Sequence, residues 1–151
     1  MDDINQYHQI AAATIARVFL GILFFFQGYD SVFKVKIKNV IETYQNSFTQ
    51  NGIPKYFTSI AVWFTSCTAL IGGMLLIIGL YQYTALYLLG LNLLITAVGF
   101  GMNTAMWDTK FVFPRLILII FLLAIPPTWN CLSVDTLFFL PDIKLNTIPK
   151  P

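Results

Sequence analysis

The chain has 151 residues, of which 57% are hydrophobic and only 11% are charged, with a formal net charge of +2. Soluble domains carry about 25% charged residues, so this composition indicates a membrane protein. The small net charge and the lack of a basic run with interleaved aromatic residues argue against nucleic-acid binding. The length predicts a single transmembrane domain over residues 1–151.

The first apolar stretch, residues 10–28, contains an arginine. The uncharged residues between Arg17 and Asp30 rise only about 18 Å as a helix, whereas a bilayer core is about 30 Å thick. A membrane-spanning helix must therefore extend back to about Ile10 and carry Arg17 about 10 Å into the membrane, with Asp30 at the opposite rim. The acidic N-terminus lacks the basic region of a secretory signal, so we expect this helix to be retained.

A second helix is predicted over residues 32–49, in the long connection that follows. Apolar residues recur there every three or four positions, which is the spacing of one helical face. The lysines of the segment lie off that face, so the pattern predicts an amphipathic helix in the membrane interface. Turn-forming residues at 51–54 end it. The apolar face consists of Phe33, Ile37, Ile41, Tyr44 and Phe48.

Three further apolar stretches, residues 60–80, 84–106 and 111–129, are each long enough to cross a bilayer as a helix. The link 81–83 is so short that the second and third spans must be antiparallel neighbours. The predicted fold is therefore all-α. It is an integral membrane bundle of four transmembrane helices, with the amphipathic interfacial helix between the first and second.

Lysines concentrate in the connection between the first two spans, at Lys34, Lys36, Lys38 and Lys55. The positive-inside rule then places this connection in the cytoplasm and both termini on the outer side of the membrane. The alternative is that these lysines only serve the interfacial helix.

Small residues four positions apart occur on each of the first three predicted spans. Such faces let helix backbones approach closely in lipid, where no hydrophobic force drives association. We expect them to pack inside this chain or against another chain. The pairs are Ala12 with Ala16, Ala69 with Gly73, and Ala97 with Gly101.

Several motifs follow one another along the chain in a familiar order. They are Arg17 and Gly21 in the first span, the turn at Gly28, the corner Gly52-Ile53-Pro54, LIGGMLLIIGL at 70–80 and LSVD at 132–135. In this order and spacing they resemble the DoxX-like family of small four-helix bacterial membrane proteins. The resemblance implies a multi-pass protein of the bacterial inner membrane. It also implies a connection with membrane oxidoreductases, such as a thiosulfate:quinone oxidoreductase, or with redox-stress and thiol-handling systems.

The sequence departs from the family pattern at two places. The family usually carries a glutamate just before the double glycine, where this chain has Ala69. The turn after the first span commonly carries a basic residue or a histidine, and here it reads Gly28-Tyr29-Asp30. Active roles that the family assigns to those positions do not transfer to this chain.

Arg17 is the most informative candidate for a binding site, because a charged side chain inside a span faces a protein interior or a polar cavity. Two interpretations stay open. Arg17 either reaches an interface or a carboxylate that fixes the bundle, or it contacts a quinone headgroup, a lipid phosphate or an anionic substrate. Asp30, Asp108 and Asp135 are the carboxylates considered, and Asp135 is favoured because the two termini share one side of the membrane.

The other candidates lie in or after the third span. Asn92 and Asn103 are expected to hydrogen-bond across helices. Trp107 and Asp108 can line the mouth of a pocket, although tryptophans near span ends also form interfacial belts. Gln27 is expected to be merely interfacial. The candidate ligand- or lipid-binding residues are Arg17, Asp135, Asn103, Trp107 and Asp108.

No catalytic or metal site is expected. The only histidine is His8, so neither a Ser-His-Asp arrangement nor a haem held between two histidines can be built from this chain alone. Cys67 and Cys131 are far apart and form no CxxC motif. We expect no cofactor bound by the chain alone, with a quinone or a lipid as the class of ligand.

Two functions are compatible with these observations. The first is a small non-catalytic integral membrane subunit of a bacterial membrane complex, respiratory or quinone-linked, with a lipid or quinone contact near Arg17. Its partners would be membrane lipids and other integral membrane subunits. The alternative is a stand-alone oxidoreductase component or carrier that binds a small hydrophobic or anionic ligand.

Overall fold

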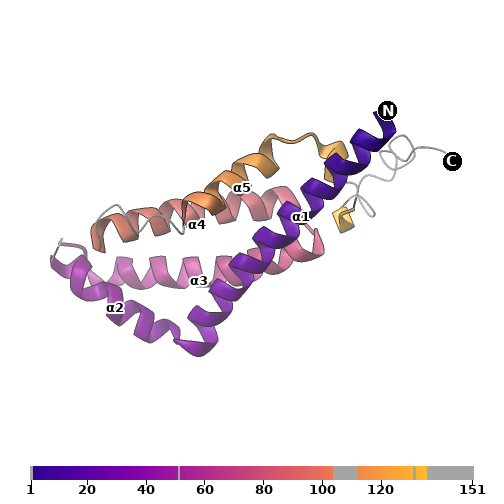
Figure 1. Ribbon diagram of the computed structural model, residues 1–151. Coiled ribbons are helices and arrows are strands. Elements are labelled where there is room, and N and C mark those ends of the chain that lie inside the picture. The colour runs from indigo at the N-terminus through magenta and orange to yellow at the C-terminus, as the bar shows by residue number, and fades with distance from the viewer. Residues whose placement is uncertain (1, 51, 104–111, 131, 136–151) are drawn as a thin grey trace.

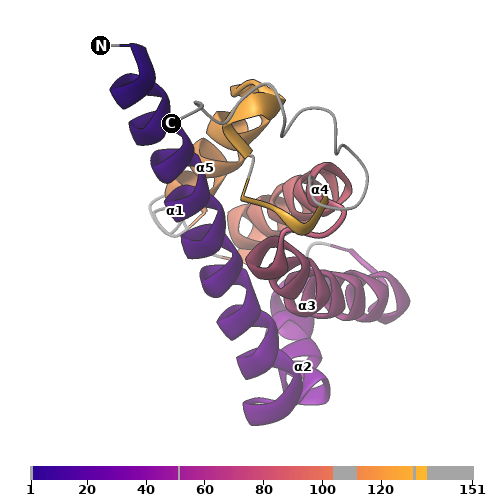
Figure 2. The same ribbon diagram turned by 90° about the vertical axis from the view of Figure 1, so that its right-hand side faces the viewer.

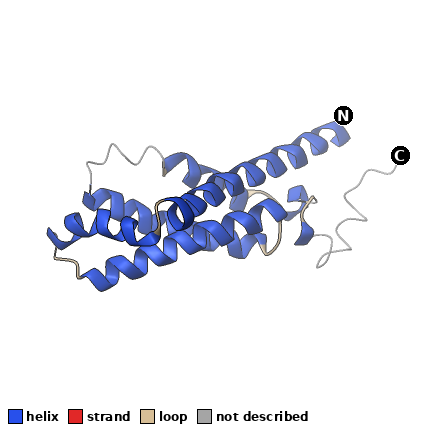
Figure 3. Cartoon of the chain, turned by 90° about the horizontal axis from the view of Figure 1, so that it is seen from below, coloured by secondary structure: helices blue, strands red, loops and turns tan. Residues whose placement is uncertain are grey.

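The computed structural model describes residues 2–50, 52–103, 112–130 and 132–135, and every element in these ranges is a helix (Figures 1 and 3). The long helices are α1 (Asp2–Tyr29), α2 (Ile37–Gln50), α3 (Lys55–Ile78), α4 (Gln82–Asn103) and α5 (Phe113–Ala124). A π-helical turn, η1 (Asp30–Lys34), continues α1, and a 3-10 turn, η3 (Pro127–Asn130), follows α5.

Three helical segments are long and apolar enough to cross a membrane: Asn5–Lys34, Lys55–Ile78 and Gln82–Met102. They are candidate spans that overlap the stretches predicted over 10–28, 60–80 and 84–106. The first is longer at both ends than expected, and residues 104–106 of the third lie outside the described residues. The chain is thus a multi-pass membrane protein.

The fourth span, predicted over 111–129, is not confirmed. Helix α5 has 12 residues, which rise about 18 Å and fall short of a bilayer core. Its end has a clear cause, because Ile125 precedes the pair Pro126-Pro127 and takes an extended conformation with ψ 148°. A residue before proline is driven out of the helical region by steric conflict with the proline ring.

The helices form a bundle that α1 crosses obliquely (Figures 1 and 2). Helices α3 and α4 lie side by side and antiparallel, as the short link predicted, and α5 packs on α4 and α1. The centre of the bundle is apolar and is filled by side chains from α1, α3, α4 and α5. Its fully buried members include Leu20, Phe24, Leu76, Leu86, Leu89 and Leu122.

Helix α1 makes its most extensive contact with α3, and glycines allow it. A Cβ atom on Gly73 would lie 2.4 Å from the backbone nitrogen of Phe25, and one on Gly28 would lie 2.3 Å from the backbone nitrogen of Leu70. The expected role of Gly73 in close packing is therefore confirmed.

Two of the other small residues do not take the packing role expected of them. On α1 the contact is made by Gly21 and Gly28, while Ala12 is exposed. On α4, Gly101 is exposed, and no atom of the described residues lies within 4 Å of its Cβ position. The pattern identified faces that permit close approach, but tertiary packing uses only some of them.

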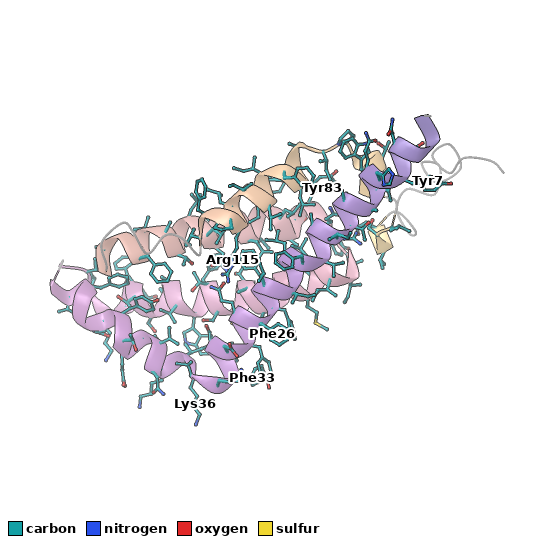
Figure 4. All side chains as sticks on the ribbon, in the orientation of Figure 1. Tyr7, Phe26, Phe33, Lys36, Tyr83 and Arg115 are labelled. Carbon is teal, nitrogen blue, oxygen red and sulfur yellow. The ribbon has the colours of Figure 1, made fainter. Side chains whose placement is uncertain are left out.

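The amphipathic helix is shorter than predicted. Lys36 has a positive φ of 65°, which interrupts the helical path, so α2 begins at Ile37 and Phe33 belongs to η1 instead. Figure 4 shows Phe33 and Lys36 on the outside of this bend. The rest of the apolar face packs against the bundle, since Ile37 and Phe48 are buried and α2 contacts both α3 and α4. Its place at the membrane surface stays a prediction.

Candidate functional site

Arg17 lies in a polar cluster where α1 meets the end of α3, the start of α4 and the segment 132–135. Its side chain is only 3% exposed. Nη2 donates a hydrogen bond to the carbonyl oxygen of Leu132 at 2.7 Å, and Nη1 donates a longer one to Oε1 of Gln82 at 3.5 Å. The prediction that Arg17 needs a polar partner from another part of the chain is confirmed.

Gly79 makes the space for this guanidinium group. It ends α3 in the left-handed conformation, with φ 79°, and its N–H donates to the carbonyl oxygen of Leu75. A Cβ atom here would lie 2.6 Å from Nη1 of Arg17 and 3.0 Å from Cβ of Ser133. Glycine is thus required both by the backbone conformation and by the close approach of the arginine.

Asp135 lies at the same end of the bundle as Arg17, as predicted, but its carboxylate hydrogen-bonds to the backbone at the start of α4. Its two oxygens accept hydrogen bonds from the backbone N–H groups of Tyr81 and Gln82, each at 2.8 Å. The N–H of Asp135 donates to the carbonyl oxygen of Gly79 at 3.0 Å. A carboxylate at a helix start satisfies free N–H groups and complements the helix dipole.

Arg17 and Asp135 are therefore linked through Gln82 rather than by the direct ion pair that the sequence favoured. The side-chain oxygen of Gln82 accepts a hydrogen bond from Arg17, and its backbone N–H donates one to Asp135. Among the described residues, Nε of Arg17 and Nε2 of Gln82 are buried without an acceptor. The cluster thus has the capacity for one more hydrogen-bond acceptor.

A separate cavity of about 130 Å³ lies between α1, α2, α3 and α4. Its walls are mostly apolar, with a few hydroxyl and amide groups that can hydrogen-bond to a ligand. The polar lining residues are Gln27, Ser31, Tyr44, Thr65, Ser66 and Thr96. The apolar ones include Val40, Phe48, Val62, Ala69, Ile95 and Phe100.

Asn92 of α4 supports one wall of this cavity. It is fully buried, and its Nδ2 donates to the carbonyl oxygen of Thr65 on α3 at 2.9 Å. The hydroxyl of Thr96 donates to the backbone and side-chain oxygens of Asn92, at 2.8 and 3.2 Å. The predicted hydrogen bond across helices is confirmed for Asn92, and it fixes α3 against α4 beside the cavity.

Ala69 lines the same cavity and is fully buried. It occupies the position at which the family resemblance leads one to expect a glutamate. Among the residues that the structure describes, none that lines the cavity carries a carboxylate, imidazole, thiol or amine, and this part of the lining is suited to a neutral ligand.

Tyr44 is the titratable side chain among the described residues of the cavity wall. It stacks on Phe48, with 5.9 Å between ring centroids, and meets the edge of Phe100 at 6.3 Å. Burial raises the pKa of its hydroxyl above the usual tyrosine value, because a charged phenolate is poorly solvated there. The group is therefore a neutral hydrogen-bond donor at physiological pH.

Arg115 and Gln27 form a contact that was missed at the sequence level. Nη1 of Arg115 donates to Oε1 of Gln27, and the guanidinium carbon lies 5.6 Å from the centre of the Phe24 ring. Gln27 is not merely interfacial, as was expected, because it joins α1 to α5 and lines the cavity. The sequence held one indication of this contact, since Gln27 and Arg115 are polar residues within two otherwise apolar stretches.

Three candidate residues are not placed by the structure. Trp107 and Asp108 lie outside the described residues, and Asn103 is the last residue of α4, with a side chain that is not described. Within the described ranges, no group of three or more His, Cys, Asp or Glu residues could hold a metal ion.

Comparison with known proteins gives one match. A family model described as DoxX matches residues 12–102, a range that contains α2, α3, most of α1 and nearly all of α4. No curated protein and no solved structure matches the chain.

Proposed function

We propose a function on the premise that this chain belongs to the DoxX family, as the match over residues 12–102 establishes. The chain is a small non-catalytic integral membrane subunit of a bacterial inner-membrane complex, respiratory or quinone-linked, with both termini on the periplasmic side. It holds the ring of a quinone in the cavity between α1, α2, α3 and α4. The cavity is the observation that carries this proposal.

The size and lining of the cavity support a quinone ring. Apolar cavities of about 150 Å³ take up a benzene ring, and this one measures about 130 Å³. Tyr44 and Ser66 are lining residues, and a hydroxyl group can donate a hydrogen bond to a quinone carbonyl oxygen. The cavity is too small for an isoprenoid tail, which would have to leave between helices into the lipid.

The surface of the bundle supports a role as a subunit. Large apolar side chains are exposed on α1, α3 and α4, among them Phe19, Met74 and Leu94. Lipid covers such surfaces, but an exposed small residue such as Gly101 also allows the close approach of a helix from another chain. The described part of the cavity lining contains no charged group, which favours binding over catalysis.

The alternative is a stand-alone oxidoreductase component or carrier. A second location for the ligand is Arg17, where two buried donors lack an acceptor. A ligand could reach that cluster only by displacing the segment 132–135, because Arg17 is almost fully buried.

The test is purification of the full chain in mild detergent, followed by identification of partners and titration with decylubiquinone. We expect stoichiometric membrane partners and saturable quinone binding. Ala69→Leu fills the cavity and should weaken binding about tenfold, a loss of about 1.4 kcal/mol. Ala12→Leu, on the exposed face of α1, is the matched control and should leave binding unchanged.

Each of the other outcomes contradicts a part of the proposal. A lone, monodisperse protein that binds the quinone would establish the stand-alone alternative. Loss of binding in Arg17→Lys together with normal binding in Ala69→Leu would move the ligand to the arginine cluster. A folded wild-type protein that does not bind the quinone would overturn the cavity assignment.

A further inference from the structure

A second hollow lies on the outside of the bundle, between the end of α1 and the start of α5. It is an open groove of about 440 Å³, and we call it the Arg115 groove. Figure 4 shows Arg115 and Phe26 on this side of the molecule. The lining residues are Ile22, Leu23, Phe26, Gln27, Asp30, Ser31, Val35 and Arg115.

The positive charge of Arg115 is not balanced by a carboxylate among the described residues. Its contacts are the neutral side-chain oxygen of Gln27 and the ring of Phe24. Asp30 lines the groove, but its carboxylate is already paired with Lys34 at 2.7 Å. Arg115 is also in the first turn of α5, where the helix dipole disfavours a cation. Once Lys34 is counted with its partner Asp30, the charge of Arg115 is the one left without a counter-ion among the described residues at the groove, and an anion would balance it.

The depth of the groove indicates which anion can reach it. It is formed by the last turns of the segment Asn5–Lys34, where a membrane-spanning helix arrives at the headgroup layer. On its other side, Ile22 and Phe26 are exposed apolar side chains that face the acyl chains. A single molecule that meets both conditions has an anionic head and a hydrocarbon tail.

We propose that the Arg115 groove binds an anionic phospholipid. The guanidinium group engages the headgroup phosphate through donors other than Nη1, because an arginine fork matches phosphate oxygens in a bidentate way. The hydroxyl of Ser31 lies at the headgroup end of the groove, and one acyl chain runs along Ile22 and Phe26. Basic pockets between membrane helices are a known mode of anionic headgroup recognition.

This site is distinct from the proposed quinone cavity. Gln27 and Ser31 line both hollows, but the lipid contact depends on Arg115, which does not line the cavity. The lipid proposal therefore stands without the proposed function, and Ala69→Leu should leave lipid binding unchanged.

The test is native mass spectrometry of the full chain in detergent, titrated with dioleoyl phosphatidylglycerol or with dioleoyl phosphatidylcholine. We expect one phosphatidylglycerol molecule to bind about tenfold more tightly than phosphatidylcholine. Arg115→Gln should abolish this preference, while Arg115→Lys should keep a part of it. Lys38→Gln, on the exposed face of α2, removes the same charge elsewhere and should keep the full preference.

A second variant keeps the proposal testable if Arg115→Gln fails to fold. Val35→Trp fills the groove but retains Arg115, and it should weaken phosphatidylglycerol binding while circular dichroism shows unchanged helicity. Full preference for phosphatidylglycerol in a folded Arg115→Gln variant would overturn the proposal. So would equal loss in Lys38→Gln, which would indicate diffuse charge attraction. Displacement of the lipid by millimolar inorganic phosphate would overturn it in favour of a free-anion site.

Discussion

Gly79 and Arg17 share one small space at the end of the bundle, since a Cβ atom on Gly79 would lie 2.6 Å from Nη1 of the arginine. The relationship joins the end of α3 to the charged residue buried in α1. The glycine is needed twice, because its φ of 79° is costly for any residue with a Cβ and because a Cβ atom would force the guanidinium group to shift from its present position.

Gly79→Ala should therefore destabilise the protein more than its backbone strain alone. The strain costs about 1–2 kcal/mol, and displacement of Arg17 from its acceptors adds to it. Gly52→Ala is the matched control, because Gly52 has a similar φ of 78° but nothing within 4 Å of a Cβ position. Unfolding in mixed micelles of dodecyl maltoside and SDS, followed by circular dichroism, measures both. Equal losses in the two variants would show that the arginine adapts freely.

The burial of Arg17 was predictable from the sequence, but its partners were not. The length of the uncharged run forces the arginine into the membrane, and membrane energetics demand a polar partner. Which partner it finds depends on how the segment 132–135 returns to the bundle. Asp135 was the natural choice by charge, yet free N–H groups at the start of α4 take its carboxylate. This competition arises only in the folded chain.

The cavity was not predictable, for a related reason. Thr65, Ser66 and Thr96 are unremarkable in apolar helices. They come together because α3 packs against α4, and α2 then closes the cavity. The short fourth helix, by contrast, had a signal in the sequence, since Pro126-Pro127 interrupts the expected span. The break at Lys36 had no comparable signal, because the apolar repeat runs through it.

Asp135→Ala should lower the free energy of unfolding by about 1–2 kcal/mol, the usual cost of losing a helix cap. Asp135→Asn should cost less, because its amide oxygen still accepts one hydrogen bond. Hydrogen exchange should accelerate at the amides of Tyr81 and Gln82. Asp30→Ala is the control, since its ion pair with Lys34 is exposed and such pairs contribute little. A cost for Asp135→Ala no larger than for Asp30→Ala would contradict the capping role.

Ionisation of Tyr44 should loosen the packing of α2 at alkaline pH. Burial raises the pKa of this hydroxyl, so the folded state binds its proton more tightly than the unfolded state does. The resulting stabilisation is complete below the ordinary tyrosine pKa of about 10 and is lost as the pH rises through the higher pKa of the folded state. Stability measured from pH 8 to 12 should fall less steeply in Tyr44→Phe than in the wild type. The difference between their absorbance titrations at 295 nm should show one tyrosine that ionises late; a midpoint at or below 10 would contradict this account.

Alanine substitution should have opposite effects at two glycines inside helices, Gly90 on α4 and Gly73 where α3 crosses α1. Alanine is favoured over glycine inside a helix by about 0.5–1 kcal/mol, and Gly90→Ala should realise that gain because its nearest neighbour would be Ile119 at 3.9 Å. Gly73→Ala should instead destabilise by about 1–3 kcal/mol, since its Cβ would meet the backbone nitrogen of Phe25 at 2.4 Å and force the two helices apart. Both variants are measured by unfolding in mixed micelles. A Gly73→Ala protein as stable as Gly90→Ala would mean that α1 and α3 do not cross at these glycines in the membrane.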